Sequence, residues 1–141
     1  ERTGEGHVLQ DFVELESDIV TRIACAREDF PAFYEFCLAV AGSNSIDEPL
    51  PDLPHSADEE TRKLLDIVAF IRRLAAQCAG LTDFRQYLFG LYFNTLFRAT
   101  IAHPERKEKK DMRAWMLASI LCRRLACWDD PWPPQEWTIP Q

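Results

Sequence analysis

The chain has 141 residues, of which 47% are hydrophobic and 28% charged, with a formal net charge of −7 at pH 7. This length suits one domain, and the apolar content is enough for a core, which excludes a largely disordered chain. No run of about 18 apolar residues occurs, so a membrane-spanning helix is excluded as well.

Apolar residues recur at three- and four-residue steps along most of the chain, a pattern that predicts helices and no strands. The first helix is expected from Val8 to Ala26, and the second from Pro31 to Ala41 with Gly42 at its end. The prolines of residues 43–55 are too dense for a helix, so these residues are expected to form an acidic surface loop.

Three further helices are expected after this loop. Each begins after residues suited to capping its first turn: Ser56 with Glu59 for the helix that ends at Ala79, Thr82 for residues 83–102, and Asp111 for residues 112–127.

The fourth expected helix of the chain, over residues 83–102, is apolar on nearly every side, and such a helix is normally central and buried. It is therefore expected either to form the core or to pack its excess apolar surface against another subunit. Its apolar residues are Phe84, Tyr87, Leu88, Phe89, Leu91, Tyr92, Phe93, Leu96, Phe97 and Ile101.

The last residues, 129–141, hold four prolines and the tryptophans Trp132 and Trp137. The prolines exclude a helix, and the tryptophans are expected either to cover the bundle or to dock on a partner. The predicted fold is all-α: a single irregular bundle of about five helices over residues 1–128, with a central apolar helix and an extended Trp/Pro-rich C-terminal tail packed on it.

The charges are divided along the chain. Residues 1–60 hold 15 acidic and 3 basic side chains, whereas residues 61–128 hold 5 acidic and 13 basic ones. The basic side chains could track the phosphates of a nucleic acid, or they could pair with the acidic half of the chain. The candidate anion-binding residues are Arg72, Arg73, Arg106, Lys107, Lys109, Lys110, Arg113, Arg123 and Arg124.

Arg98 is followed five residues later by His103, at the end of the fourth helix. This spacing resembles the R-x4-H motif of the HEPN ribonucleases, all-helical and usually dimeric proteins that cleave RNA without a metal. The resemblance implies that Arg98 stabilises the phosphate and His103 transfers protons. The residue after the arginine is usually polar in that family and is Ala99 here. The alternative is that Arg98 pairs with an acid and His103 only ends the helix.

The five cysteines lie within apolar helical patterns and show no C-x-x-C spacing. Reduced, buried thiols and a cytoplasmic protein are therefore expected. Phosphate-binding loops, nucleophile elbows and zinc-protease motifs are absent from the sequence. Neither a metal site nor a cofactor is expected.

These patterns favour binding over catalysis. We expect a non-catalytic accessory or regulatory subunit that docks on a nucleic acid or nucleoprotein complex through its basic residues. Two alternatives stay open: a HEPN-like ribonuclease that uses Arg98 and His103, and a protein–protein adaptor or inhibitor that acts through the acidic N-terminal half. A protein partner or a homodimer is compatible with the binding hypotheses.

Overall fold

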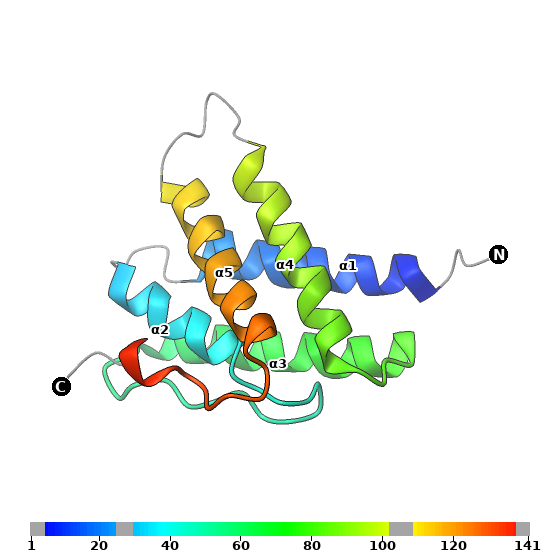
Figure 1. The fold of residues 1–141 in the computed structure, drawn as a ribbon, viewed down its shortest axis with the longest axis horizontal. Helices are drawn as coiled ribbons and strands as arrows, with labels where there is room; N and C mark the ends of the chain where they lie inside the picture. The colour runs from blue at the N-terminus through cyan, green and yellow to red at the C-terminus, as the bar shows by residue number, and fades with distance from the viewer. Residues whose placement is uncertain (1–4, 25–29, 102–108, 138–141) are drawn as a thin grey trace.

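The computed structural model describes residues 5–24, 30–101 and 109–137, and these form an all-helical bundle without strands (Figure 1). The all-α fold class predicted from the periodicity is confirmed. No helix in these ranges is long and apolar enough to cross a membrane. The elements are α1 (Glu5–Asp18), the π-helical turn η1 (Ile19–Ile23), α2 (Phe30–Val40), α3 (Glu59–Ala79), α4 (Phe84–Thr100), α5 (Lys109–Ala126) and the short 3-10 helix η3 (Gln135–Trp137).

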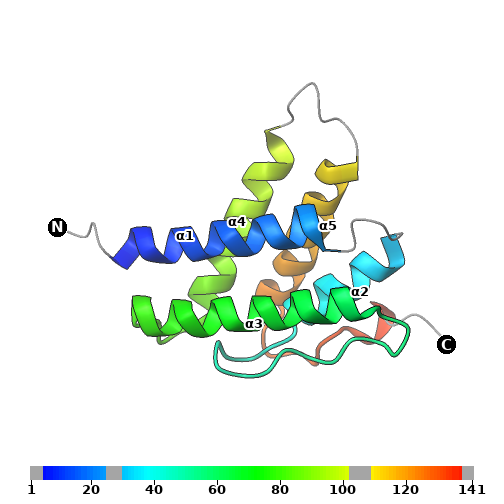
Figure 2. The ribbon, with the colours of Figure 1, turned by 180° about the vertical axis from the view of Figure 1, so that it is seen from behind.

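Two pairs of helices cross each other in the bundle. Helices α1 and α3 lie side by side, and α4 and α5 form an antiparallel hairpin across them (Figures 1 and 2). Helix α2 packs at one end, against α3 and α5. The hairpin extends past α1, so only part of α4 lies over the α1–α3 pair.

The core lies where these helices meet. Helix α4 contributes the fully buried residues Tyr87, Leu88 and Leu91, and α5 contributes Leu117 and Leu121. The opposite side of α4 is exposed. The bundle therefore buries one side of a helix that is apolar all round, and leaves the other side in solvent.

Two helix caps differ from those expected. Asp58 caps α3 and accepts a 2.7 Å hydrogen bond from the Thr61 N–H, whereas Ser56 lies two residues earlier. Asp83, not Thr82, caps α4 and accepts a backbone N–H of the first turn at 3.0 Å. A carboxylate at either position also carries a negative charge that interacts favourably with the positive end of the helix dipole. A hydroxyl group has no such charge.

Two helices begin nearly a turn earlier than expected. Helix α1 starts at Glu5 and α5 at Lys109, each three residues earlier than expected. Helix α3 ends as expected, because Gly80 adopts a left-handed conformation (φ 59°) that a side chain disfavours. The expected end of the first helix at Ala26 lies outside the described residues.

The tail runs along the outside of the bundle beside α2. The indole of Trp132 donates a hydrogen bond to the Leu38 carbonyl at 3.0 Å, and the Tyr34 hydroxyl donates to the Trp137 carbonyl at 3.1 Å. Both tryptophans pack against the core of their own chain and are partly buried there. The two residues proposed above for partner docking are thus already engaged within the molecule.

Candidate functional site

Three of the nine candidate anion-binding residues lie inside the bundle. Arg72 is 2% exposed, Arg113 is 8% exposed and Arg124 is 1% exposed. Arg113 and Arg124 are eleven residues apart and do point the same way, but they point into the core with Leu117 and Leu121. An enclosed guanidinium cannot reach a phosphate outside the protein, so these three arginines take no part in an outward basic face.

Arg72 of α3 forms a buried ion pair with Glu16 of α1. Its Nε and Nη2 donate to the two carboxylate oxygens at 2.8 and 2.9 Å, and Nη2 also donates to the Val40 carbonyl at 2.8 Å. The Tyr87 hydroxyl of α4 donates to Glu16 Oε1 at 3.0 Å. One polar network therefore joins α1, α3 and α4 within the apolar core.

The network sets the protonation of its members. Burial opposes the charge of Arg72, but the Glu16 carboxylate outweighs this effect and raises the pKa of Arg72 above its ordinary value. Burial first, and the Glu16 charge second, raise the pKa of Tyr87 well above 10. The folded protein thus keeps the guanidinium charged and the phenol neutral.

Replacing Tyr87 with phenylalanine is expected to make the free energy of unfolding fall less steeply as the pH rises into the alkaline range. The unfolded chain ionises this tyrosine near pH 10.0, whereas the folded protein holds it neutral to higher pH. The contribution of Tyr87 to the free energy of unfolding is therefore complete below pH 10 and falls as the pH rises toward the folded-state pKa. Urea unfolding of the unchanged chain and of the Tyr87→Phe variant, between about pH 8 and about pH 11, measures how the free energy of unfolding of each depends on pH. Parallel pH profiles would contradict the expectation.

Arg124 of α5 ties the loop to the bundle. Its Nε donates to the Ala41 carbonyl at 3.0 Å, and its Nη2 donates to the Ser43 carbonyl at 3.2 Å and to Asn44 Oδ1 at 2.8 Å. The guanidinium carbon lies 4.1 Å from the centre of the Trp128 ring, within the range of a cation–π interaction. Every one of these contacts is intramolecular and structural.

Arg113 has a similar role near the other end of α5. Its Nη1 donates to the Ala24 carbonyl at 2.9 Å, and its guanidinium carbon lies 5.1 Å from the centre of the Phe33 ring. Because Ala24 follows η1 directly, this contact holds the end of the first helical segment against α5.

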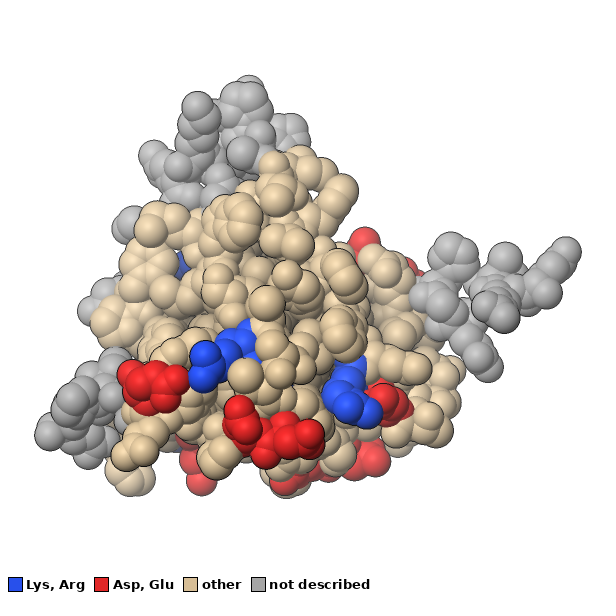
Figure 3. Space-filling view, in the orientation of Figure 1, with Lys and Arg blue, Asp and Glu red and all other residues tan. Residues whose placement is uncertain are grey.

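Of the other six candidates, two are described, and they lie on different helices. Arg73 is exposed on α3, and Arg123 of α5 pairs with Glu136 at 3.0 Å. On the face shown in Figure 3, exposed basic side chains stand beside acidic ones. The remaining four candidates lie outside the described residues or have undescribed side chains: Arg106, Lys107, Lys109 and Lys110.

Arg98 pairs with an acid, the alternative given above to a catalytic role. Its guanidinium forms an ion pair with Asp18 of α1, and its Nε donates to Asn94 Oδ1 at 2.8 Å. His103 lies outside the described residues. The ribonuclease hypothesis for Arg98 and His103 therefore stays a prediction.

A row of exposed aromatic side chains runs along α4. Phe89, Phe93 and Phe97 follow one another at four-residue steps and are 46%, 61% and 62% exposed. The rings of Phe89 and Phe93 stack with their centres 6.3 Å apart. Together with neighbouring apolar residues at the end of α4 and on α5, they make a surface that is named here the α4–α5 face: Phe89, Phe93, Phe97, Ile101, Met112 and Trp115.

The two helices present this face on one side of the hairpin. Tyr92 of α4 forms a hydrogen bond with the Cys122 thiol of α5, which raises the pKa of Tyr92 above its ordinary value. Trp115 lies seven residues before Cys122, about two turns along the same side of α5. The Trp115 side of α5 therefore adjoins the Tyr92 side of α4, next to the start of the row at Phe89.

The described part of the hairpin around the α4–α5 face holds few charged side chains. Within residues 86–100 and 112–122 the charged side chains are Arg98 and Arg113, which bond to the segment that holds α1 and η1. In Figure 3 the described surface of the hairpin is mostly uncharged, and most basic and acidic side chains in view lie toward the lower edge of the molecule. The phenylalanines at four-residue steps were the sequence signal for this face.

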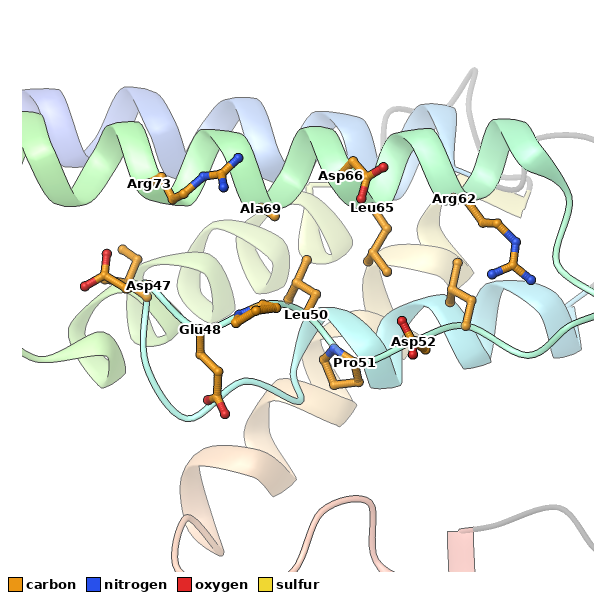
Figure 4. A pocket seen from close by; sticks show the side chains of 13 residues that line it. Asp47, Glu48, Leu50, Pro51, Asp52, Arg62, Leu65, Asp66, Ala69 and Arg73 are labelled. Atoms are coloured by element: carbon orange, nitrogen blue, oxygen red, sulfur yellow. The ribbon is translucent and has the colours of Figure 1, made fainter.

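A groove of about 520 Å³ lies between the proline-rich loop and α3 (Figure 4). Arg62 and Arg73 stand toward its two ends, with Asp66 between them on the same helix. The loop adds Asp47, Glu48 and Asp52 to the lining. Charges of both signs line the groove, so its chemistry selects neither an anion nor a cation.

Most of the described cysteines are not buried. Cys37 is buried, whereas Cys78 and Cys122 are exposed and Cys127 is half-buried. The expectation of buried thiols is wrong for the two exposed ones, because the apolar stripes of α3 and α5 are wider than the sides that the bundle covers. Among the described residues, no group of three or more His, Cys, Asp or Glu side chains could hold a metal ion.

Comparison with known proteins found no relative. No protein-family model matches the chain, and neither a curated protein nor a solved structure matches it.

Proposed function

We propose that this chain is a non-catalytic accessory subunit that assembles with protein through its α4–α5 face. The partner surface is a helix that presents an uncharged apolar side. The observation that supports the proposal is a set of half-exposed aromatic and aliphatic side chains on two helices that pack against each other. Exposed apolar surface of this kind marks interaction sites, and aromatic residues and methionine are enriched there.

The spacing of the phenylalanines favours a helix as the partner element. Side chains at four-residue steps form a ridge that is inclined to the helix axis, with a groove on either side. The ridge of a second helix fills such a groove, which is the common way in which helices pack. The free thiols of Cys78, Cys122 and Cys127 favour a reducing compartment, so the proposal places this assembly in the cytoplasm.

The other binding hypotheses stay predictions with less support. Docking on a nucleic acid now depends on Arg73, Arg123 and the four basic residues that lack a structural description, because three arginines are enclosed. An adaptor or inhibitor role of the acidic N-terminal half also stays open. Glu16 pairs with Arg72 inside the core and cannot reach a partner, but this pairing does not involve the other acidic side chains of that half.

Selection of helices from a displayed library of amphipathic peptides tests the proposal. Against the immobilised full chain, the selected helices are expected to carry apolar residues at three- and four-residue steps. They should lose at least about tenfold in affinity for the Phe93→Glu variant, since a buried carboxylate would face their apolar side. Phe93 is 61% exposed, so its replacement leaves the core intact.

Arg73→Glu is the matched control, because Arg73 is exposed on α3, away from the hairpin. The selected helices should bind this variant as they bind the unchanged chain. Selected helices that bind Phe93→Glu and the unchanged chain equally tightly would contradict the proposed function.

A further inference from the structure

We infer that the partner of the α4–α5 face is a second copy of this chain, related to the first by a two-fold axis that passes beside the exposed side of α4 near Phe93. The inference rests on the proposed function, because it names the partner of the same face. Three features of the face support a second copy: its shape, its lack of charge and its area.

The shape of the face is complementary to itself. Phe89, Phe93 and Phe97 form one ridge of four-residue steps. When two helices interdigitate ridges of this same class, their axes cross at about −50°. A two-fold axis through the middle of the ridge brings Phe89 of one copy toward Phe97 of the other, with the two Phe93 side chains near the axis. Each copy offers the same surface and accepts the same surface, as a two-fold interface requires.

The lack of charge on the face also favours a second copy. The chain carries a net charge of −7, so most ways of bringing two copies together place acidic surfaces near each other. Within residues 86–100 and 112–122 of the hairpin, the charged side chains Arg98 and Arg113 bond to the first helical segment, so this part of the surface adds no free charge to a contact between two copies. Most of the acidic side chains in view lie toward the lower edge of the molecule (Figure 3).

The area of the face is enough for a stable dimer. Large apolar side chains bury roughly 150–250 Å² each, so six half-exposed ones offer on the order of 600 Å² per copy. A two-fold contact then buries roughly 1,200 Å² in total before Tyr92, Leu96 and Ser119 beside the face are included, which reaches the range of specific interfaces. We therefore expect a dimer with a dissociation constant in the micromolar range.

Sedimentation equilibrium of the full chain from about 1 to about 100 µM tests the inference. The unchanged chain is expected to be a monomer–dimer mixture, and Phe93→Glu should raise the dissociation constant at least about 100-fold. Phe70→Glu is the matched control: Phe70 is a 53% exposed phenylalanine on α3, outside the face. Its variant should dimerise as the unchanged chain does.

Salt separates this interface from a charge-driven one. Contact through the α4–α5 face predicts a dissociation constant that does not rise with ionic strength, whereas pairing of the acidic half of one copy with the basic half of another weakens as salt increases. A monomer at 100 µM, a dimer that survives Phe93→Glu, or a dimer that salt dissociates would each overturn the inference. If the chain is a monomer but selected helices bind its face, the second copy is excluded while the proposed function stands; if neither associates with the face, both fail.

Discussion

Replacing Glu16 with glutamine is expected to lower the free energy of unfolding by about 3–5 kcal/mol, because it leaves the buried guanidinium of Arg72 without a counter-charge. Glu16 is 0% exposed and Arg72 is 2% exposed, so water cannot take over the lost interaction. The substitution also weakens the acceptor of the Tyr87 hydroxyl. Urea unfolding at neutral pH measures the change. If the slope of the free energy of unfolding against urea concentration stays the same, the variant differs in stability and not in the surface that it exposes on unfolding.

Glu14→Gln is the control on the same helix. Glu14 is exposed, so its replacement is expected to change the stability by no more than about 0.5 kcal/mol. The double variant Glu16→Met with Arg72→Met should recover most of the lost stability, since apolar residues of similar size often replace a buried ion pair without a net cost. A loss for Glu16→Gln no larger than that for Glu14→Gln would show that the ion pair does not hold α1 to α3.

The helices could be predicted because their evidence is local. Apolar residues at three- and four-residue steps indicate a helix wherever it packs, and Gly80 ends α3 for a reason that lies in its own backbone. The choice of cap is less certain from sequence when several suitable residues are adjacent. Ser56 and Asp58 both suit a cap, and the backbone path into the helix decides between them.

The sequence contains a sign that Arg72 is buried, which a count of charges overlooks. Arg72 follows Val68 by four residues and precedes Ala75 by three, so it occupies a position of the apolar stripe of α3. Glu16 lies in the same way between Val13 and Val20 of the first helical segment. A charged residue within an apolar stripe indicates a buried pair, but which two residues pair depends on which helices lie side by side.

The exposed side of α4 could not be predicted from its composition. An apolar helix is covered on all sides only if other elements surround it, and here the hairpin has the α1–α3 pair on one side alone (Figures 1 and 2). Tyr87 and Leu91 face that pair, whereas Phe93 faces away from it. The sequence therefore left two alternatives for this helix, a buried core or contact with another subunit, and the arrangement of the helices favours the second for its outer side.

Replacing Arg124 with methionine is expected to lower the free energy of unfolding by about 3–5 kcal/mol, since it leaves buried carbonyls without a donor and removes a cation–π contact. The carbonyls of Ala41 and Ser43 accept from Arg124 at 3.0 and 3.2 Å, and methionine offers no replacement for these hydrogen bonds. Methionine fills a similar volume, so the loss does not come from an empty cavity. Urea unfolding measures the loss, and tryptophan fluorescence reports whether Trp128 becomes more exposed to water.

Arg123→Met separates this structural role from a general effect of lost positive charge. Arg123 is the neighbouring residue, and its ion pair with Glu136 is partly exposed, so its loss is expected to cost about 1 kcal/mol or less. Both variants remove one positive charge from the same turn of α5. Equal losses would mean that the charge of the turn matters and the buried position does not. A much larger loss for Arg124 would show that a residue resembling a phosphate contact in sequence instead holds the loop to the bundle.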